Sequence, residues 1–188
     1  MAKPNEPAVK DAGDNKTPID SLIAKLRSHD GMERQHAREA LVSIGTPAVA
    51  PLAALLKDSC QQVRWEAAKA LGSIADATAA PALVDSLEDK DREIRWLAAE
   101  GLIAMRYGGL RPLLQALINR GPNFYSRPSV HHALRTLCER GLRDLVEPIL
   151  AALKGVEPEL EVPQAAMKAQ DKLAALEAGR DAKSARDK

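Results

Sequence analysis

Two stretches of this chain, VRWEAAKALGSIA at residues 63–75 and IRWLAAEGLIAM at residues 94–105, align with an offset of 31 residues. A third stretch, ERQHAREALVSIG at residues 33–45, fits the same frame 30 residues earlier. Self-similarity at a fixed period of this length is typical of repeat architectures, in which each unit buries its apolar face against its neighbours. The sequence therefore predicts a solenoid.

Each copy carries an alanine and a leucine four residues apart, and these pairs set the register of the repeats. Two weaker copies follow the three stretches quoted above. Side chains four residues apart share one face of a helix, so we expect both members of every pair to lie in the core. The pairs are Ala37/Leu41, Ala67/Leu71, Ala98/Leu102, Ala133/Leu137 and Ala169/Leu173.

A second apolar helix is predicted before each copy, at residues 18–28, 47–58, 79–89, 110–120 and 145–155. Leucines four residues apart, such as Leu52 and Leu56, place apolar side chains on one helical face. Thr17-Pro18 and Thr46-Pro47 put a capping hydroxyl before a proline, which predicts a helix start. No segment alternates with period two, so we expect an all-α chain without strands.

The unit APALVDSLEDKDREIRWLAAEGL at residues 80–102 resembles a HEAT repeat, in the short form found in phycobilisome-lyase-type proteins. Its first helix carries proline and leucines, its turn carries Asp, and its second helix opens with Ile-Arg and continues Ala-Ala-x-x-Leu. The resemblance covers roughly residues 17–177 and implies an all-α, right-handed α-solenoid of about five HEAT-like antiparallel helix pairs. A disordered N-terminal segment is expected at residues 1–16 and a charged tail at residues 178–188.

Trp65 and Trp96 occupy one position in successive repeats, on the side of their helices opposite the leucine stripe. The equivalent residues of the other copies are Gln35, His131 and Met167. The resemblance implies that second helices line the concave face, where these five residues would form a ladder. Exposed aromatic side chains often dominate an interface, so the ladder is predicted to bind a protein or peptide partner. The alternative is that each indole lies across the neighbouring helix and only rigidifies the stack.

The stretch GPNFYSRPSVHH, residues 121–132, contains an insertion. The last leucine of the first helix and the core alanine of the second are 11 residues apart in the first three copies and 16 in the last two. Inserted loops often carry function, so Phe124 and Tyr125 are candidate contact residues. Alternatively, both rings fold back as a lid over the apolar end of the array. In that arrangement Arg120 and Arg127 are expected to pair with Glu157, Glu159 and Glu161.

Arg34, Arg64 and Arg95 recur one residue before the ladder positions. They form either a basic stripe for an acidic partner or a set of structural ties to acids in the repeat turns, such as Asp58 and Asp89. The formal net charge of +1 leaves no surplus of positive charge, which favours the structural interpretation.

The composition argues against several classes of protein. Near-neutral charge disfavours nucleic-acid binding, and no apolar run approaches the roughly 18 residues of a membrane span. The first residues lack the apolar core of a signal peptide. Cys60 and Cys138 are too few for a disulfide framework and are expected to be reduced. We therefore expect a cytoplasmic protein of bacterial type, without nucleic-acid or membrane partners.

No catalytic motif was found: a glycine-rich phosphate loop, His-Glu-x-x-His and Gly-x-Ser-x-Gly are all missing from the sequence. His131 and His132 point about 100° apart on a helix, so they do not share one metal ion. We expect no cofactor, and predict a non-enzymatic interaction or scaffolding module. Two alternatives stay open: an accessory bilin-lyase-like protein acting on a chromophore-bearing partner, which the resemblance suggests, and a structural subunit of a larger assembly.

Overall fold

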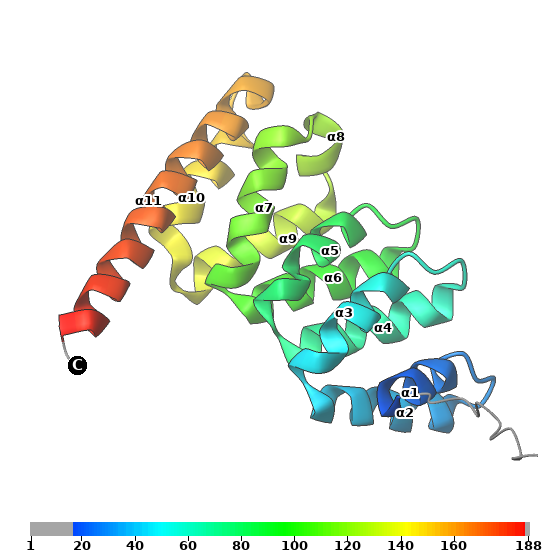
Figure 1. Ribbon diagram of the computed structural model, residues 1–188. Coiled ribbons are helices and arrows are strands. Elements are labelled where there is room, and N and C mark those ends of the chain that lie inside the picture. The colour runs from blue at the N-terminus through cyan, green and yellow to red at the C-terminus, as the bar shows by residue number, and fades with distance from the viewer. Residues whose placement is uncertain (1–16, 187–188) are drawn as a thin grey trace, which may run out of the picture.

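The computed structural model describes residues 17–186, with side chains to residue 179, as helix pairs stacked side by side (Figure 1). No strand occurs in this part of the chain, so the prediction of an all-α solenoid is confirmed. The segment 1–16, expected to be disordered, lies outside the described residues. The first three pairs are α1 (Pro18–Lys25) with α2 (Gly31–Ile44), α3 (Val49–Leu55) with α4 (Gln61–Ile74), and α5 (Ala80–Ser86) with α6 (Arg92–Met105).

The rest of the array is less regular. The fourth pair is α7 (Tyr107–Asn119) with α9 (Pro128–Leu137), and the one-turn helix α8 (Pro122–Tyr125) lies between them in sequence. An irregular link, η3 (Cys138–Leu142), leads into α10 (Arg143–Ala152) and α11 (Pro158–Arg186). Because α11 continues to Arg186, the tail expected from residue 178 is largely an extension of the last helix. Short 3₁₀ turns, η1 (Thr46–Ala48) and η2 (Ala77–Ala79), precede α3 and α5.

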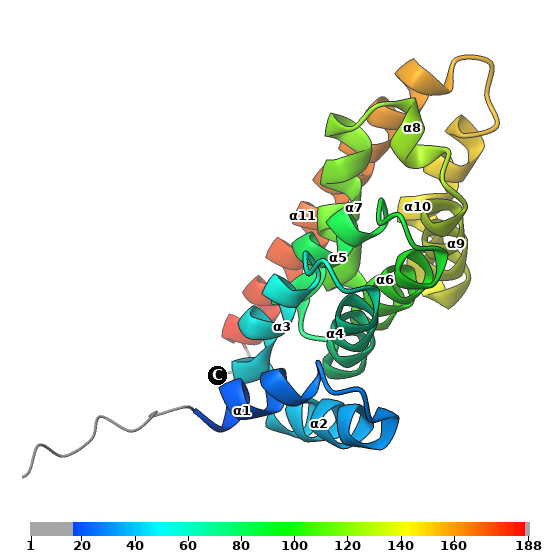
Figure 2. The same ribbon diagram turned by 90° about the vertical axis from the view of Figure 1, so that its right-hand side faces the viewer.

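Two layers of helices run along the array (Figure 2). The second helices α2, α4, α6 and α9 pack in this order in one layer, while α5 and α7 are neighbours in the other. The last pair exchanges the layers, because α10 packs against α9 and α11 packs against α7. The exchange follows a sharp turn inside η3, where Gly141 has a φ of 97°, a conformation that glycine adopts without a steric penalty.

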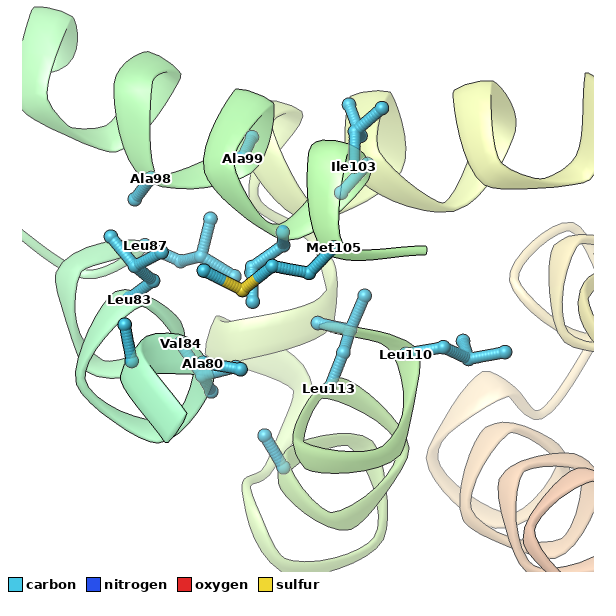
Figure 3. Packing of buried hydrophobic residues seen from close by; sticks show 14 of the residues in the cluster. Ala80, Leu83, Val84, Leu87, Ala98, Ala99, Ile103, Met105, Leu110 and Leu113 are labelled. Carbon is cyan, nitrogen blue, oxygen red and sulfur yellow. The ribbon is translucent and has the colours of Figure 1, made fainter. Parts of the chain in front are cut away.

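The predicted register of the core is confirmed. All ten residues of the Ala/Leu pairs are at most 3% exposed. Figure 3 shows the interior between α5, α6 and α7, where Leu83 and Leu87 lie beneath Ala98, and Leu113 of α7 closes the side. Alanine lets neighbouring helices approach closely, and leucine fills the space that remains.

Two of the recurring arginines, Arg34 and Arg64, form ion pairs with the next repeat. Arg64 Nη1 donates to the carbonyl oxygens of Asp58 (2.9 Å) and Ser59 (3.2 Å), and its Nε donates to the Asp89 carboxylate of the next turn (2.8 Å). Arg34 and Arg95 make the same paired bonds to carbonyl oxygens of their own turns. The predicted pairing with a turn acid of the next repeat is confirmed for Arg64. Arg34 instead pairs with Glu66 of helix α4 (3.2 Å), and Arg95 forms no ion pair with an acid among the described residues.

The inserted loop packs inward. Its helix α8 buries Phe124 (1% exposed) and Tyr125 (3% exposed) between α7 and α9. Arg120 lies 5.0 Å from the centre of the Phe124 ring and forms ion pairs with Asp85 and Glu88. Arg127 lies 3.7 Å from Glu88. The expected pairs of Arg120 and Arg127 with Glu157, Glu159 and Glu161 are therefore wrong. The end of α7 lies beside α5, its neighbour in the same layer, and α5 with its following turn supplies the acids.

Replacing Tyr125 with phenylalanine is expected to reduce the loss of stability at alkaline pH. The Tyr125 hydroxyl is buried without a hydrogen-bond partner, and burial raises the pKa of Tyr125 above its ordinary value of 10.0, with a smaller contribution from the charge of Glu159. The folded state thus holds the phenol neutral after the unfolded chain has begun to ionise. The contribution of Tyr125 to stability is full below about pH 10 and is lost as the pH rises through the folded pKa.

Urea titrations of both proteins at neutral pH and at about pH 11 measure this effect. At neutral pH, Tyr125→Phe is expected to match or slightly exceed the wild type, because it removes a buried hydroxyl that lacks a partner. An equal alkaline loss in both proteins would assign the pH dependence to other groups.

Candidate partner-binding surface

Two tryptophans from neighbouring second helices share one hollow. Trp65 of α4 is half-buried, and Trp96 of α6 is 51% exposed. Together with Arg92, Glu93 and Leu97 of α6 they line a hollow of about 380 Å³, called the Trp slot below. Both indoles point away from the leucine core, because they lie two residues before the buried alanines Ala67 and Ala98 on their helices.

A second flat group from a neighbouring helix packs on each indole, and neither of these groups lines the slot. The guanidinium of Arg38, on α2, lies 5.6 Å from the centre of the Trp65 ring. The His132 ring, on α9, stacks on Trp96 with centres 4.1 Å apart and planes inclined by 20°. Four flat groups from four successive second helices therefore stand in series, and the Trp slot is the gap in the middle.

Carboxylates hold both outer groups in place. Glu66 of α4 binds Arg38, and Glu100 of α6 lies 2.6 Å from His132 Nε2. Each of these acids comes from the same helix as the tryptophan that its partner covers. The two indoles are thus fixed before any ligand arrives, which reduces the entropy that binding would cost.

A second hollow of about 460 Å³ continues from the slot along the groove between α4 and α6. The two helices approach so closely that a Cβ on Gly72 would lie 3.3 Å from the Gly101 Cα. These glycines line the hollow, and Lys69 and Glu100 also contribute to its lining. Trp96 borders both hollows.

The repeated Ala/Leu core and the stacked helix pairs agree with a sequence match. A model of HEAT repeats matches residues 19–103 and, one repeat further on, residues 49–135. The chain belongs to the HEAT-repeat family. A search of the curated proteins gave no match.

Solved structures similar to this chain include an engineered protein, a complex of phycocyanin lyase and a designed armadillo repeat protein. An engineered protein is 21% identical over 84% of this chain and 80% of its own, with a TM-score of 0.43. The complex of CpcE and CpcF of phycocyanin lyase from Nostoc sp. PCC7120 gives 25% identity over 90% of this chain and 70% of that chain, with a TM-score of 0.48. A designed armadillo repeat protein in complex with the peptide (KR)4 is 21% identical over 86% of this chain and 90% of its own, with a TM-score of 0.40.

Two residues of the predicted ladder, Gln35 and His131, do not contact the tryptophans in the structure. Gln35 is exposed on α2 and donates to Glu39 on its own helix (2.8 Å). His131 was expected beside Trp96, but it is exposed on α9 and its neighbour His132 makes the stack. Successive side chains on a helix point about 100° apart. The rotation of α9 about its own axis, as it packs against α6, therefore decides which histidine faces the indole.

Three other candidates lie away from the slot. Met167 is 45% exposed on α11, which packs against α7 and α10, so the exchange of layers removes it from the ladder. Phe124 and Tyr125 are buried and present no contact surface. Arg38 and His132 were not predicted at this surface. Their ion-pair partners Glu66 and Glu100 lie one and four residues after Trp65 and Trp96, and this spacing is the signal that the sequence contains.

Other features of the described residues add no chemistry to this surface. A hollow of about 760 Å³ lies between α10 and α11, with Arg143, Asp144, Glu147 and Lys172 along it and no aromatic side chain. No group of three or more His, Cys, Asp or Glu residues in the described part of the chain is placed to hold a metal ion. None of its helices is long and apolar enough to cross a membrane.

Proposed function

We propose that this HEAT-repeat protein is a non-enzymatic scaffold that binds a protein or peptide partner on its second-helix face, at the Trp slot. The observation that carries the proposal is Trp96, which is half exposed and yet fixed by the stack on His132. A large aromatic side chain that is both accessible and rigid supplies contact area at low entropic cost, and such residues dominate measured interfaces.

The surroundings of the slot support the same function. Trp65, half-buried under Arg38, forms the opposite wall, so a ligand would meet an indole on each side. The second hollow extends the surface along α4 and α6 and provides a place for a further side chain. A short segment of a partner could therefore be gripped by shape as well as by apolar contact.

Affinity capture from the native host, followed by mass spectrometry, tests the proposal with three proteins. The wild type and His131→Ala are expected to recover the same partner, because His131 is exposed outside the stack. Trp96→Ala is expected to reduce recovery at least tenfold. Its melting temperature should fall by only about 2–4 °C, because the lost stack contributes about 1 kcal/mol.

Equal recovery by Trp96→Ala and the wild type would contradict the proposed function. A coloured bilin adduct formed on the captured partner in the presence of this protein would contradict the non-enzymatic part and favour the lyase-like alternative.

A further inference from the structure

The Trp slot has a shape that selects its ligand. We propose, building on the proposed function, that the slot takes a proline ring from a proline-rich segment of the partner, and that this segment runs along the α4–α6 groove. Arg38 covers Trp65 from the α2 side and His132 covers Trp96 from the α9 side, so the faces left free are those toward the slot. The saturated, puckered ring of a proline inserted there would pack its C–H groups against the two indoles.

Charge favours an uncharged ring. The slot lining carries one cation and one anion, Arg92 and Glu93, and neither makes an ion pair with another described residue. A cationic side chain would be attracted by Glu93 and by the indole faces, but it would be repelled by Arg92 and by Arg38, which lies against the Trp65 ring. An anionic side chain would meet Glu93 and the electron-rich faces of two indoles. A proline ring meets neither penalty.

The spacing of the two hollows favours a polyproline II segment. Gly72 lies seven residues after Trp65, and Gly101 lies five residues after Trp96, so the two glycines are about 10.5 Å and about 7.5 Å further along their helices at 1.5 Å per residue. Residues i and i+3 of a polyproline II helix lie on the same side, about 9 Å apart. A proline in the slot therefore places the residue three positions before or after it, depending on the direction of the segment, over the Gly72–Gly101 hollow.

The width of the groove argues against a helical ligand in the slot. Neighbouring packed helices such as α4 and α6 have axes about 8–10 Å apart, whereas an α-helix with its side chains is about 10–12 Å wide. The backbone of a partner helix would therefore rest outside the groove and could reach the slot only with a side chain. Aromatic-lined grooves are a known way of docking preformed polyproline II segments, which lose little entropy on binding.

Tryptophan fluorescence provides a direct assay, because Trp65 and Trp96 are the two tryptophans of the chain. The probe is an N-acetylated, C-amidated decaproline, and a Gly-Ser decamer with the same end groups is its control. We expect decaproline to change the emission of the wild type saturably and the Gly-Ser peptide to leave it unchanged. Isothermal titration should show binding at least tenfold weaker to Trp96→Ala and unchanged binding to His131→Ala.

Three results would overturn the inference. The first is no saturable response to decaproline, and the second is equal affinity of Trp96→Ala and the wild type. The third is a saturable response to tetramethylammonium without one to decaproline, which would make the slot a cage for cations. Failure of decaproline while partner capture still depends on Trp96 would overturn the proline assignment alone, whereas capture independent of Trp96 would overturn the proposed function with it.

Discussion

Replacing Phe124 with alanine is expected to lower the free energy of unfolding by about 4 kcal/mol. The ring is 1% exposed, and its short helix α8 packs against α7 and α9. Truncation removes buried apolar area and leaves a cavity, because helices fixed by their other neighbours relax only partly. Arg120, which lies 5.0 Å from the ring centre, also loses its aromatic partner. Urea denaturation followed by circular dichroism measures the change.

Asn123→Ala is the matched control for this prediction, because Asn123 is exposed on the same turn of helix. It should unfold within about 0.5 kcal/mol of the wild type. Phe124→Leu should fall between the two, since it keeps much of the apolar volume. If Phe124→Ala unfolds like the wild type but loses the partner, the insertion is a contact site and the packing shown by the structure does not persist in solution.

The regular part of this fold could be predicted because burial repeats with the chain. The alanine and leucine of each copy, such as Ala67 and Leu71, must face the core for helices to pack, so their spacing carries the register directly. The structural role of Arg64 could be predicted for a similar reason, since an acid accompanies the arginine in each repeat turn. Both features involve residues of the same repeat or of adjacent repeats, so a single sequence is enough to reveal them.

The parts of the fold that differ from the prediction depend on which helices share a layer, and the periodicity of the sequence does not specify this. The pattern around Ala169 and Leu173 predicts a helix, but it does not say in which layer that helix lies. The turn at Gly141 places α11 beside α7 and so removes Met167 from the ladder. Likewise, the spacing revealed an insertion at Phe124, whereas the acids that pair with Arg120 depend on which helices share a layer.

The tryptophan positions were predicted correctly as a repeated feature, but the stacking partners were not. Whether His131 or His132 meets Trp96 depends on how α9 is rotated against α6, and rotation by one residue exchanges them. The burial of the Glu66 carboxylate was not predicted either, because a glutamate beside a tryptophan on a helix is normally solvated. Only the three-dimensional arrangement brings Arg34 and Arg38 of the preceding repeat onto it.

Replacing Glu66 with alanine is expected to lower the free energy of unfolding by about 3 kcal/mol. Glu66 is 3% exposed and accepts hydrogen bonds from Arg34 Nε (3.2 Å), Arg38 Nη1 and Gln62 Nε2 (3.1 Å). Without the carboxylate, two largely buried guanidinium groups lose the charge that compensates their desolvation, which is why breaking such a pair costs more than the pair itself contributes. Thermal melts and urea titrations measure the loss.

Two variants separate this buried charge from ordinary surface effects. Glu66→Gln keeps the shape and part of the hydrogen bonding, so its loss should be smaller than that of Glu66→Ala. Glu39→Ala removes an exposed glutamate whose partner is Gln35, and it should change stability by no more than about 0.5 kcal/mol. If Glu66→Ala and Glu39→Ala unfold alike, water solvates Arg34 and Arg38 of the first repeat, and their ion pairs with Glu66 do not stabilise the contact between the first two repeats.

The Glu66 variants also connect stability to the Trp slot. Glu66 holds Arg38 over the outer face of Trp65, so Glu66→Ala should free the guanidinium and let the indole move. At temperatures where the variant stays folded, its affinity for decaproline should fall severalfold, because ordering Trp65 then becomes part of the cost of binding. Arg38→Met removes the same cover but leaves the buried Glu66 carboxylate its hydrogen bonds from Arg34 and Gln62, so it should reproduce the weaker binding with a smaller loss of stability. Weaker binding in Glu66→Ala but not in Arg38→Met would assign the effect to general loosening of the first repeats instead of to the wall of the slot.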